Sequence, residues 1–117
     1  MRPFLAITLA SALALSGCGG ACGNEVSQTI SSPSGQLKAV VFSRNCGATT
    51  GVNTQVSILR AEEALPNEGA NTFIANGAMP IVVQWQNDKT IQIFGLGAST
   101  PIKQNLTVSG VGVVYAN

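Results

Sequence analysis

The chemistry open to this chain centres on three thiols, those of Cys18, Cys22 and Cys46, because the sequence contains no histidine. Histidine is the most common general base and the most common metal ligand in proteins. Without it, a serine or cysteine nucleophile lacks its usual partner, and cysteines alone at this number do not complete a tetrahedral zinc site. We therefore expect no metal and no other cofactor. A catalytic role remains open only to a Cys46 thiolate or to the adjacent carboxylates of Glu62 and Glu63.

A polar segment from residue 44 to residue 53 is the most promising place for a binding site. It combines a guanidinium, amides and hydroxyls, and its candidate contact residues are Arg44, Asn45, Thr49, Thr50 and Asn53. A disulfide at Cys46 would make this connection rigid, and a rigid polar loop loses little conformational entropy on binding. The alternative is a structural loop whose threonines cap backbone groups.

The residues leading into Cys18 have the layout of a secretory leader. Arg2 is followed by an apolar stretch from Phe4 to Leu15. A helix over that stretch rises about 18 Å, well short of the roughly 30 Å hydrocarbon core that a spanning helix must cross. The final Leu15-Ser16-Gly17-Cys18 resembles a bacterial lipobox. The resemblance implies that residues 1–17 are removed and that the Cys18 thiol receives a diacylglycerol. The alternative is an ordinary leader that leaves Cys18 as a plain thiol.

The residue after Cys18 bears on the destination of such a lipoprotein. It is Gly19, and not the aspartate that resembles a signal for retention in the inner membrane. In a bacterium with two membranes, we therefore expect the protein on the periplasmic face of the outer membrane, held there by the lipid on Cys18.

Charged residues are few and balanced beyond the leader. The chain therefore lacks the basic stripe of a nucleic-acid-binding domain and the polybasic patch that would attract an anionic membrane surface. Its length allows one domain, which we expect at residues 25–117 after a flexible tether at 18–24. The charged side chains are Lys38, Arg44, Arg60, Lys89 and Lys103 against Glu25, Glu62, Glu63, Glu68 and Asp88.

Acylation of Cys18 would leave Cys22 and Cys46 as an even pair. In an oxidising compartment, a disulfide between them is the natural expectation. It would close a loop of about 25 residues and stabilise the fold by about 3 kcal/mol in the chain-entropy model. The alternative is a pair of free thiols, or a Cys46 buried as a small hydrophobic residue.

The pattern of apolar and turn residues predicts about eight short strands. Residues 36–44 have a nearly continuous apolar centre, typical of a central strand that is covered on both faces. Residues 54–60 alternate, and the turn dipeptides Asn76-Gly77, Asn87-Asp88 and Ser109-Gly110 separate other segments. We therefore expect an all-β fold, a small antiparallel β-sandwich or bent sheet. The expected strands are 26–30, 36–44, 54–60, 71–75, 80–86, 89–94, 103–108 and 111–115.

Several segments resemble a family of short uncharacterised bacterial proteins, many of them lipoprotein-like. The most specific part is Arg44-Asn45-Cys46-Gly47-Ala48-Thr49-Thr50-Gly51, with further similarity over 32–42, 54–58, 65–71, 83–85 and 89–91. The resemblance implies a single domain and carries no activity with it.

These observations favour a lipid-anchored binding or accessory module of the bacterial cell envelope. Its polar loop around Cys46 would contact another envelope protein or a small ligand. The alternatives are a small hydrolase-like enzyme that uses Cys46 or the loop carboxylates, and a purely structural lipoprotein.

Overall fold

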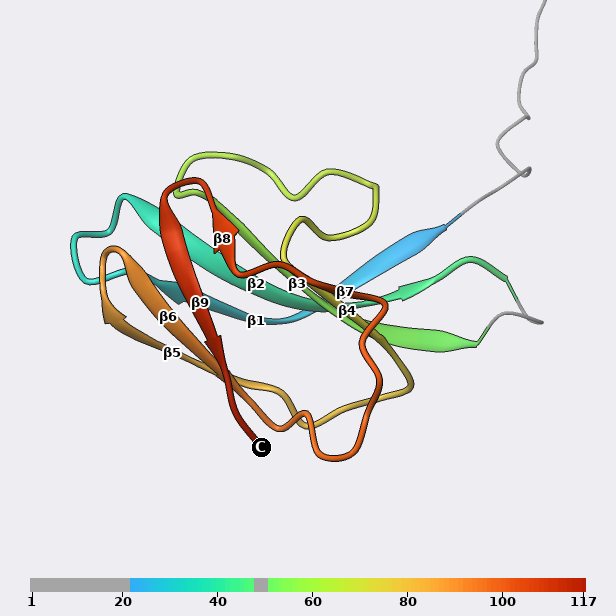
Figure 1. The fold of residues 1–117 in the computed structure, drawn as a ribbon. Helices are drawn as coiled ribbons and strands as arrows, with labels where there is room; N and C mark the ends of the chain where they lie inside the picture. Colours follow the sequence, from blue (N-terminus) through green and yellow to red (C-terminus); the bar gives the residue numbers. More distant parts are fainter. Residues whose placement is uncertain (1–21, 48–50) are drawn as a thin grey trace, which may run out of the picture.

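The computed structural model describes residues 22–47 and 51–117, which form two β-sheets packed face to face (Figure 1). The all-β fold and the sandwich architecture expected from the sequence are confirmed. Sheet A contains, in spatial order, β1 (Gly23–Ser31), β2 (Leu37–Asn45), β3 (Val52–Arg60), β4 (Phe73–Asn76) and β7 (Lys103–Gln104). Sheet B contains β5 (Val82–Asn87), β6 (Thr90–Phe94), β9 (Val111–Tyr115) and β8 (Thr107–Val108).

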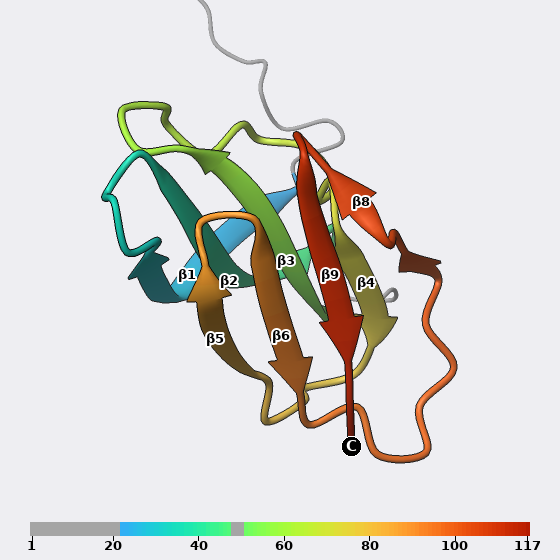
Figure 2. The ribbon, with the colours of Figure 1, turned by 60° about the vertical axis from the view of Figure 1, so that its left-hand side comes forward.

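The main core lies between the two sheets and follows from the alternation of apolar residues along each strand. Figure 2 shows β5, β6 and β9 lying across sheet A. In the hairpin of β5 and β6, Val83 stands opposite Ile93 and Trp85 stands opposite Ile91. These pairs pack against the inner face of sheet A, where Phe73 is fully buried.

The outer face of sheet A carries a second, smaller core beneath the connection from residue 61 to residue 72. Val40 and Phe42 of β2 pack there against Ala70. The side chain of Asn71 holds this connection to β3: its amide donates to the carbonyl oxygen of Ile58 and its oxygen accepts from the Ile58 amide. The expectation that β2 is covered on both faces is therefore confirmed.

One expected strand, 103–108, is wrong as a single element. Residues 103–104 pair with β4 in sheet A, whereas residues 107–108 pair with β9 in sheet B. The chain crosses between the sheets at Asn105, whose backbone N–H donates to the Thr72 carbonyl oxygen. As a result β9 enters sheet B in the same direction as β6, and this pair is parallel where an antiparallel partner was expected.

The sequence assigned residues 23 and 24 to a flexible tether, but they belong to β1, which begins at Gly23. The ladder between β1 and β2 continues to the pair of Gly23 and Asn45. The loop expected at 45–53 is shortened in the same way, since Asn45 belongs to β2 and Val52 to β3. The leader 1–17, Cys18, Thr49 and Thr50 lie outside the described residues.

Candidate functional site

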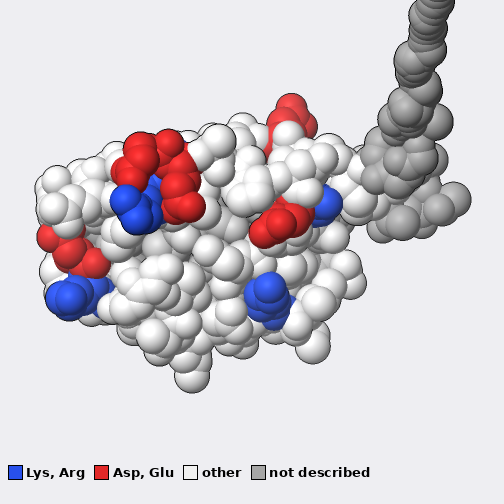
Figure 3. Space-filling model, turned by 90° about the horizontal axis from the view of Figure 1, so that it is seen from above, with Lys and Arg blue, Asp and Glu red and all other residues white. Residues whose placement is uncertain are grey.

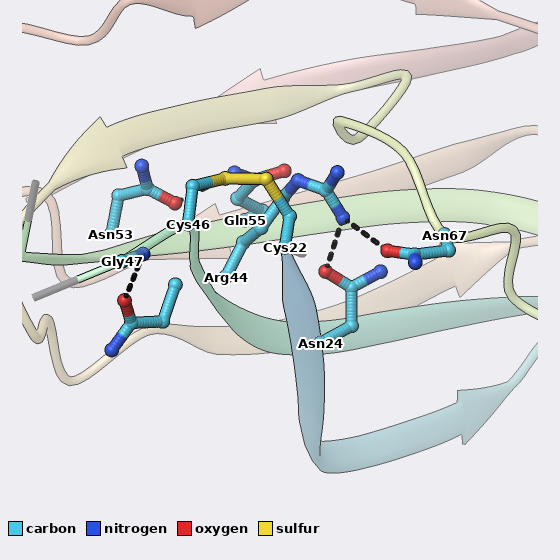
Figure 4. Close-up of a disulfide and its surroundings, with 9 residues drawn as sticks. Cys22, Asn24, Arg44, Cys46, Gly47, Asn53, Gln55 and Asn67 are labelled. Atoms are coloured by element: carbon cyan, nitrogen blue, oxygen red, sulfur yellow. Dashed lines mark hydrogen bonds between the residues drawn. A yellow bond between two sulfur atoms is a disulfide. The ribbon is translucent and has the colours of Figure 1, made fainter. Parts of the chain in front are cut away.

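The Cys22–Cys46 disulfide lies at the end of the ladder between β1 and β2 (Figure 4). Gly23 pairs with Asn45 in that ladder, so the two cysteines stand opposite each other one step further on. The predicted disulfide is confirmed. It closes the end of the hairpin that has no turn, and it fixes β1 at the edge of sheet A.

Arg44 lies two residues before the disulfide and links three segments of the chain. Its Nη1 donates to the side-chain oxygen of Asn24 on β1 at 2.7 Å and to that of Asn67 at 2.8 Å. The Nδ2 of Asn24 in turn donates to the Pro66 carbonyl at 3.1 Å. Figure 4 shows both bonds leaving from the same terminal nitrogen of the guanidinium. Arg44 thereby ties the edge strand and the connection 61–72 to β2.

Gln55 organises a second set of hydrogen bonds beside Arg44. Its side chain is buried, and its Oε1 accepts from the Ala70 amide at 2.7 Å. Its Nε2 donates to the Oδ1 of Asn53 at 2.6 Å. A buried backbone N–H needs such a partner, because an unpaired one costs about 1–3 kcal/mol.

The strand register places four polar side chains in one row across sheet A. Asn24 pairs with Arg44, Arg44 with Asn53, and Asn53 with Asn76, each on the next strand. Directly paired residues of an antiparallel sheet point to the same face. The row lies on the outer face, since Phe42, two residues before Arg44, packs beneath the connection 61–72. We call Asn24, Arg44, Asn53, Gln55 and Asn67 the amide–arginine cluster.

The structure brings together only part of the site expected from the sequence. Arg44 and Asn53 belong to the cluster, but Asn45 does not, because its side chain accepts a hydrogen bond from the Gly47 amide at 3.0 Å. Asn24, Gln55 and Asn67 were missed. Asn24 could have been predicted from the sequence, because the expected Cys22–Cys46 disulfide sets the β1–β2 register and places Asn24 opposite Arg44.

The carboxylates considered for catalysis lie elsewhere and stabilise a turn. Glu62 forms an ion pair with Arg60 at 2.9 Å, and Glu63 accepts from the Arg60 amide at 2.8 Å. The pKa of Glu62 is lowered, first by its own backbone N–H and then by the guanidinium of Arg60. The Cys46 sulfur is bonded to Cys22, so a thiolate at this position first requires reduction of the disulfide.

A groove of about 720 Å³ lies at the opposite end of the sandwich, where three hairpin turns meet. Its charged lining is largely engaged within the protein: Arg60 pairs with Glu62, and Asp88 accepts from the Ser34 amide at 2.9 Å. That hydrogen bond is also the main reason why the pKa of Asp88 is lowered. Lys89, the remaining charged residue of the lining, has no ion-pair partner within residues 22–47 and 51–117.

Acidic and basic side chains are interspersed on the side that carries the connection 61–72 (Figure 3). Within residues 22–47 and 51–117, Arg60–Glu62 is the one ion pair, and Arg44 has no carboxylate partner. The same residues contain no group of three or more histidines, cysteines and acidic residues that could hold a metal ion. They also contain no helix with the length and apolar character needed to span a membrane.

Comparison with models of known protein families, with curated proteins and with solved structures finds no match for this chain. The resemblance to short bacterial proteins therefore stays a prediction, and any function must be argued from the chain itself.

Proposed function

We propose that the protein is a lipid-anchored binding module of the bacterial cell envelope, with the amide–arginine cluster as its binding surface. The anchor is the diacylglycerol expected on Cys18. The observation that carries the proposal is the pairing of Cys22 with Cys46. The sequence has three cysteines, so this pairing leaves Cys18, at the end of the lipobox, as the remaining one.

The place of the disulfide suits a tethered domain. Only Gly19, Gly20 and Ala21 separate Cys18 from Cys22 in the sequence. A pull on the tether would act at the end of β1, an edge strand that could otherwise peel away from β2 one hydrogen bond at a time. The disulfide and the bonds from Arg44 to Asn24 oppose this separation at its first step.

The positioned groups of this surface favour a binding role over a purely structural one. Arg44 is a half-buried cation without a carboxylate partner in the described residues, and it is held in position from two sides. A positioned guanidinium with unused donors is a recognition group, because its planar fork matches carboxylate and phosphate oxygens. Because the residue after Cys18 is Gly19 and not aspartate, we propose that the module lies at the outer membrane of a two-membrane host.

The anchor is tested by metabolic labelling with radioactive palmitate and by the mass of the N-terminal peptide. The wild-type protein should carry label and begin at an acylated Cys18. The Cys18→Ser variant should carry no label and should not be cleaved before residue 18. The matched control is the double variant Cys22→Ser/Cys46→Ser, which should remain labelled. Unlabelled wild-type protein, or label that persists in Cys18→Ser, would overturn the anchor.

A further inference from the structure

The hydrogen-bonding capacity of the amide–arginine cluster is unevenly used. Arginine has five N–H donors and no acceptor, so each group facing it must present an oxygen. Asn24 and Asn67 do so, and together they occupy both hydrogens of the Arg44 Nη1. The orientation of these two side-chain amides is therefore dictated by Arg44 and cannot be reversed without losing a bond.

The same reasoning fixes the orientation of Gln55 and Asn53. The Ala70 backbone is a donor, so Gln55 must turn its oxygen toward it. The Gln55 nitrogen then faces Asn53, which must present its oxygen in turn. The Nδ2 of Asn53 is left directed away from this chain of bonds.

Every side-chain oxygen of the cluster thus accepts a hydrogen bond, whereas several of its donors make none. The occupied oxygens belong to Asn24, Asn53, Gln55 and Asn67. Within residues 22–47 and 51–117, no hydrogen bond engages the Nε or Nη2 of Arg44, or the Nδ2 of Asn53 or Asn67. The surface therefore offers unused N–H donors and one positive charge, and each of its amide oxygens already has a donor.

The strand register sets the surroundings of the free guanidinium edge. Arg44 and Asn53 are direct partners in the register of β2 and β3, which places their Cβ atoms about 5 Å apart. Asn67 contacts the same guanidinium from the connection 61–72. In Figure 4 the two other guanidinium nitrogens lie on the side turned away from Asn24, whereas the side-chain nitrogen of Asn53 lies beyond Gln55 and points away from the guanidinium.

We propose that the amide–arginine cluster binds a singly charged oxyanion, a carboxylate or a phosphodiester. Two of its oxygens accept from the Nε and Nη2 of Arg44, the guanidinium donors that no group of the described residues engages. One arginine matches one negative charge. The acceptor oxygens of such a ligand meet the free N–H groups of Arg44 and not the amide oxygens of the cluster. This inference rests on the proposed function, because it names the ligand class of that binding surface.

The test uses the protein produced from its full-length sequence, labelled with nitrogen-15 and held in a neutral detergent. Two-dimensional NMR follows the Nε–H of Arg44. The probes are N-acetyl-dialanine with a free carboxylate, the same peptide as its uncharged amide, and dimethyl phosphate. The carboxylate or dimethyl phosphate should shift this signal saturably, and the uncharged peptide should not. If neither anion shifts it up to tens of millimolar, the proposal fails.

Asn53→Asp is the most discriminating variant. Its carboxylate can still accept from Gln55, so the internal hydrogen bond is kept, but the free donor becomes an acceptor with a negative charge beside Arg44. We expect this variant to fold and to lose the saturable shift. Arg44→Lys keeps the charge and loses the fork, and it should weaken binding by about tenfold or more. Arg60→Lys is the matched control and should bind as the wild type does. Equal binding by wild type and Asn53→Asp would overturn the proposal.

Vesicles distinguish the two sources of such a ligand. If the ligand is a lipid headgroup, vesicles of phosphatidylcholine with phosphatidylglycerol should shift the Arg44 signal in the wild type and not in Asn53→Asp. If only the peptide carboxylate acts, the ligand is a carboxylate of another envelope component. Both results support an oxyanion site, and both hold whether or not Cys18 is acylated. A failed anchor and a failed ligand class are therefore told apart.

Discussion

Trp85 and Ile30 join the two sheets along one side of the sandwich, where the indole Nε1 donates to the Ile30 carbonyl oxygen at 3.0 Å. Gln28 adds a second link, since its Nε2 donates to the Ile81 carbonyl oxygen at 3.0 Å. Ile30 and Gln28 belong to β1 and Trp85 to β5, so the edge strands of sheets A and B are held to each other. Such contacts leave less of either edge open to pairing with another chain.

Tyr115 closes the other side of the sandwich and predicts a loss of stability in alkali. Its hydroxyl lies 2.6 Å from the Asn105 carbonyl oxygen and 3.3 Å from that of Thr72. Burial raises the pKa of Tyr115 from its ordinary 10.0 to about 12. The unfolded chain then loses this proton before the folded one. The contribution of Tyr115 to stability should therefore be constant below the unfolded pKa of 10.0 and should be lost as the pH rises toward about 12.

The check is urea unfolding of the wild type and of Tyr115→Phe across that pH range. The variant should lack the part of the alkaline loss that comes from the phenol. The chain contains one tyrosine, so phenolate absorbance reports its ionisation directly. Parallel loss of stability in both proteins would contradict the assignment.

Removal of the Cys22–Cys46 disulfide should lower the free energy of unfolding without changing the fold. Cys22→Ala/Cys46→Ala is expected to cost about 3 kcal/mol, because the unfolded chain regains the freedom of the closed loop. Urea unfolding measures the change, and hydrogen exchange should show faster opening at the first residues of β1. An unchanged urea midpoint would show that the disulfide does not stabilise the domain.

Gln55→Ala should destabilise the protein by about 1–3 kcal/mol, because it leaves the Ala70 N–H without its acceptor in a buried place. Gln84→Ala is the matched control, since Gln84 is exposed on β5, and it should change stability by less than about 0.5 kcal/mol. Hydrogen exchange at Ala70 gives an independent measurement. Similar effects of both substitutions would mean that the hydrogen bond to Ala70 contributes little.

Gly95→Ala should be more harmful than Gly77→Ala, although both glycines have positive φ, of 98° and 91°. A Cβ on Gly95 would clash with the Pro80 carbonyl oxygen, whereas one on Gly77 would meet nothing within 4 Å. Both variants incur the backbone strain of about 1–3 kcal/mol, and only Gly95→Ala adds the clash. Thermal unfolding of the two variants side by side tests the difference, and equal losses would refute it.

Local signals explain which parts of the fold the sequence predicted well. The hairpin of β5 and β6 is confirmed, with its turn at Asp88-Lys89, one residue later than the predicted Asn87-Asp88. The hairpin at Ser109-Gly110 is confirmed, and both residues adopt positive φ as such a turn requires. The prediction of a single strand over 103–108 was wrong, because alternation shows which face of a sheet a side chain takes and does not show where the chain passes to another sheet. That change depends on Asn105, which bonds to Thr72 far away in the sequence.

The sequence by itself determined the all-β class, most strands and the Cys22–Cys46 pair, because alternation, turn residues and cysteine number are local properties of the chain. It also singled out Arg44 and Asn53. Only the tertiary structure decided what these residues do together. Register and the connection 61–72 bring Asn24, Gln55 and Asn67 to them. In the resulting hydrogen bonds every side-chain oxygen has a donor, while some N–H donors stay free. Such a balance depends on which groups face each other, and one-dimensional spacing does not contain that information.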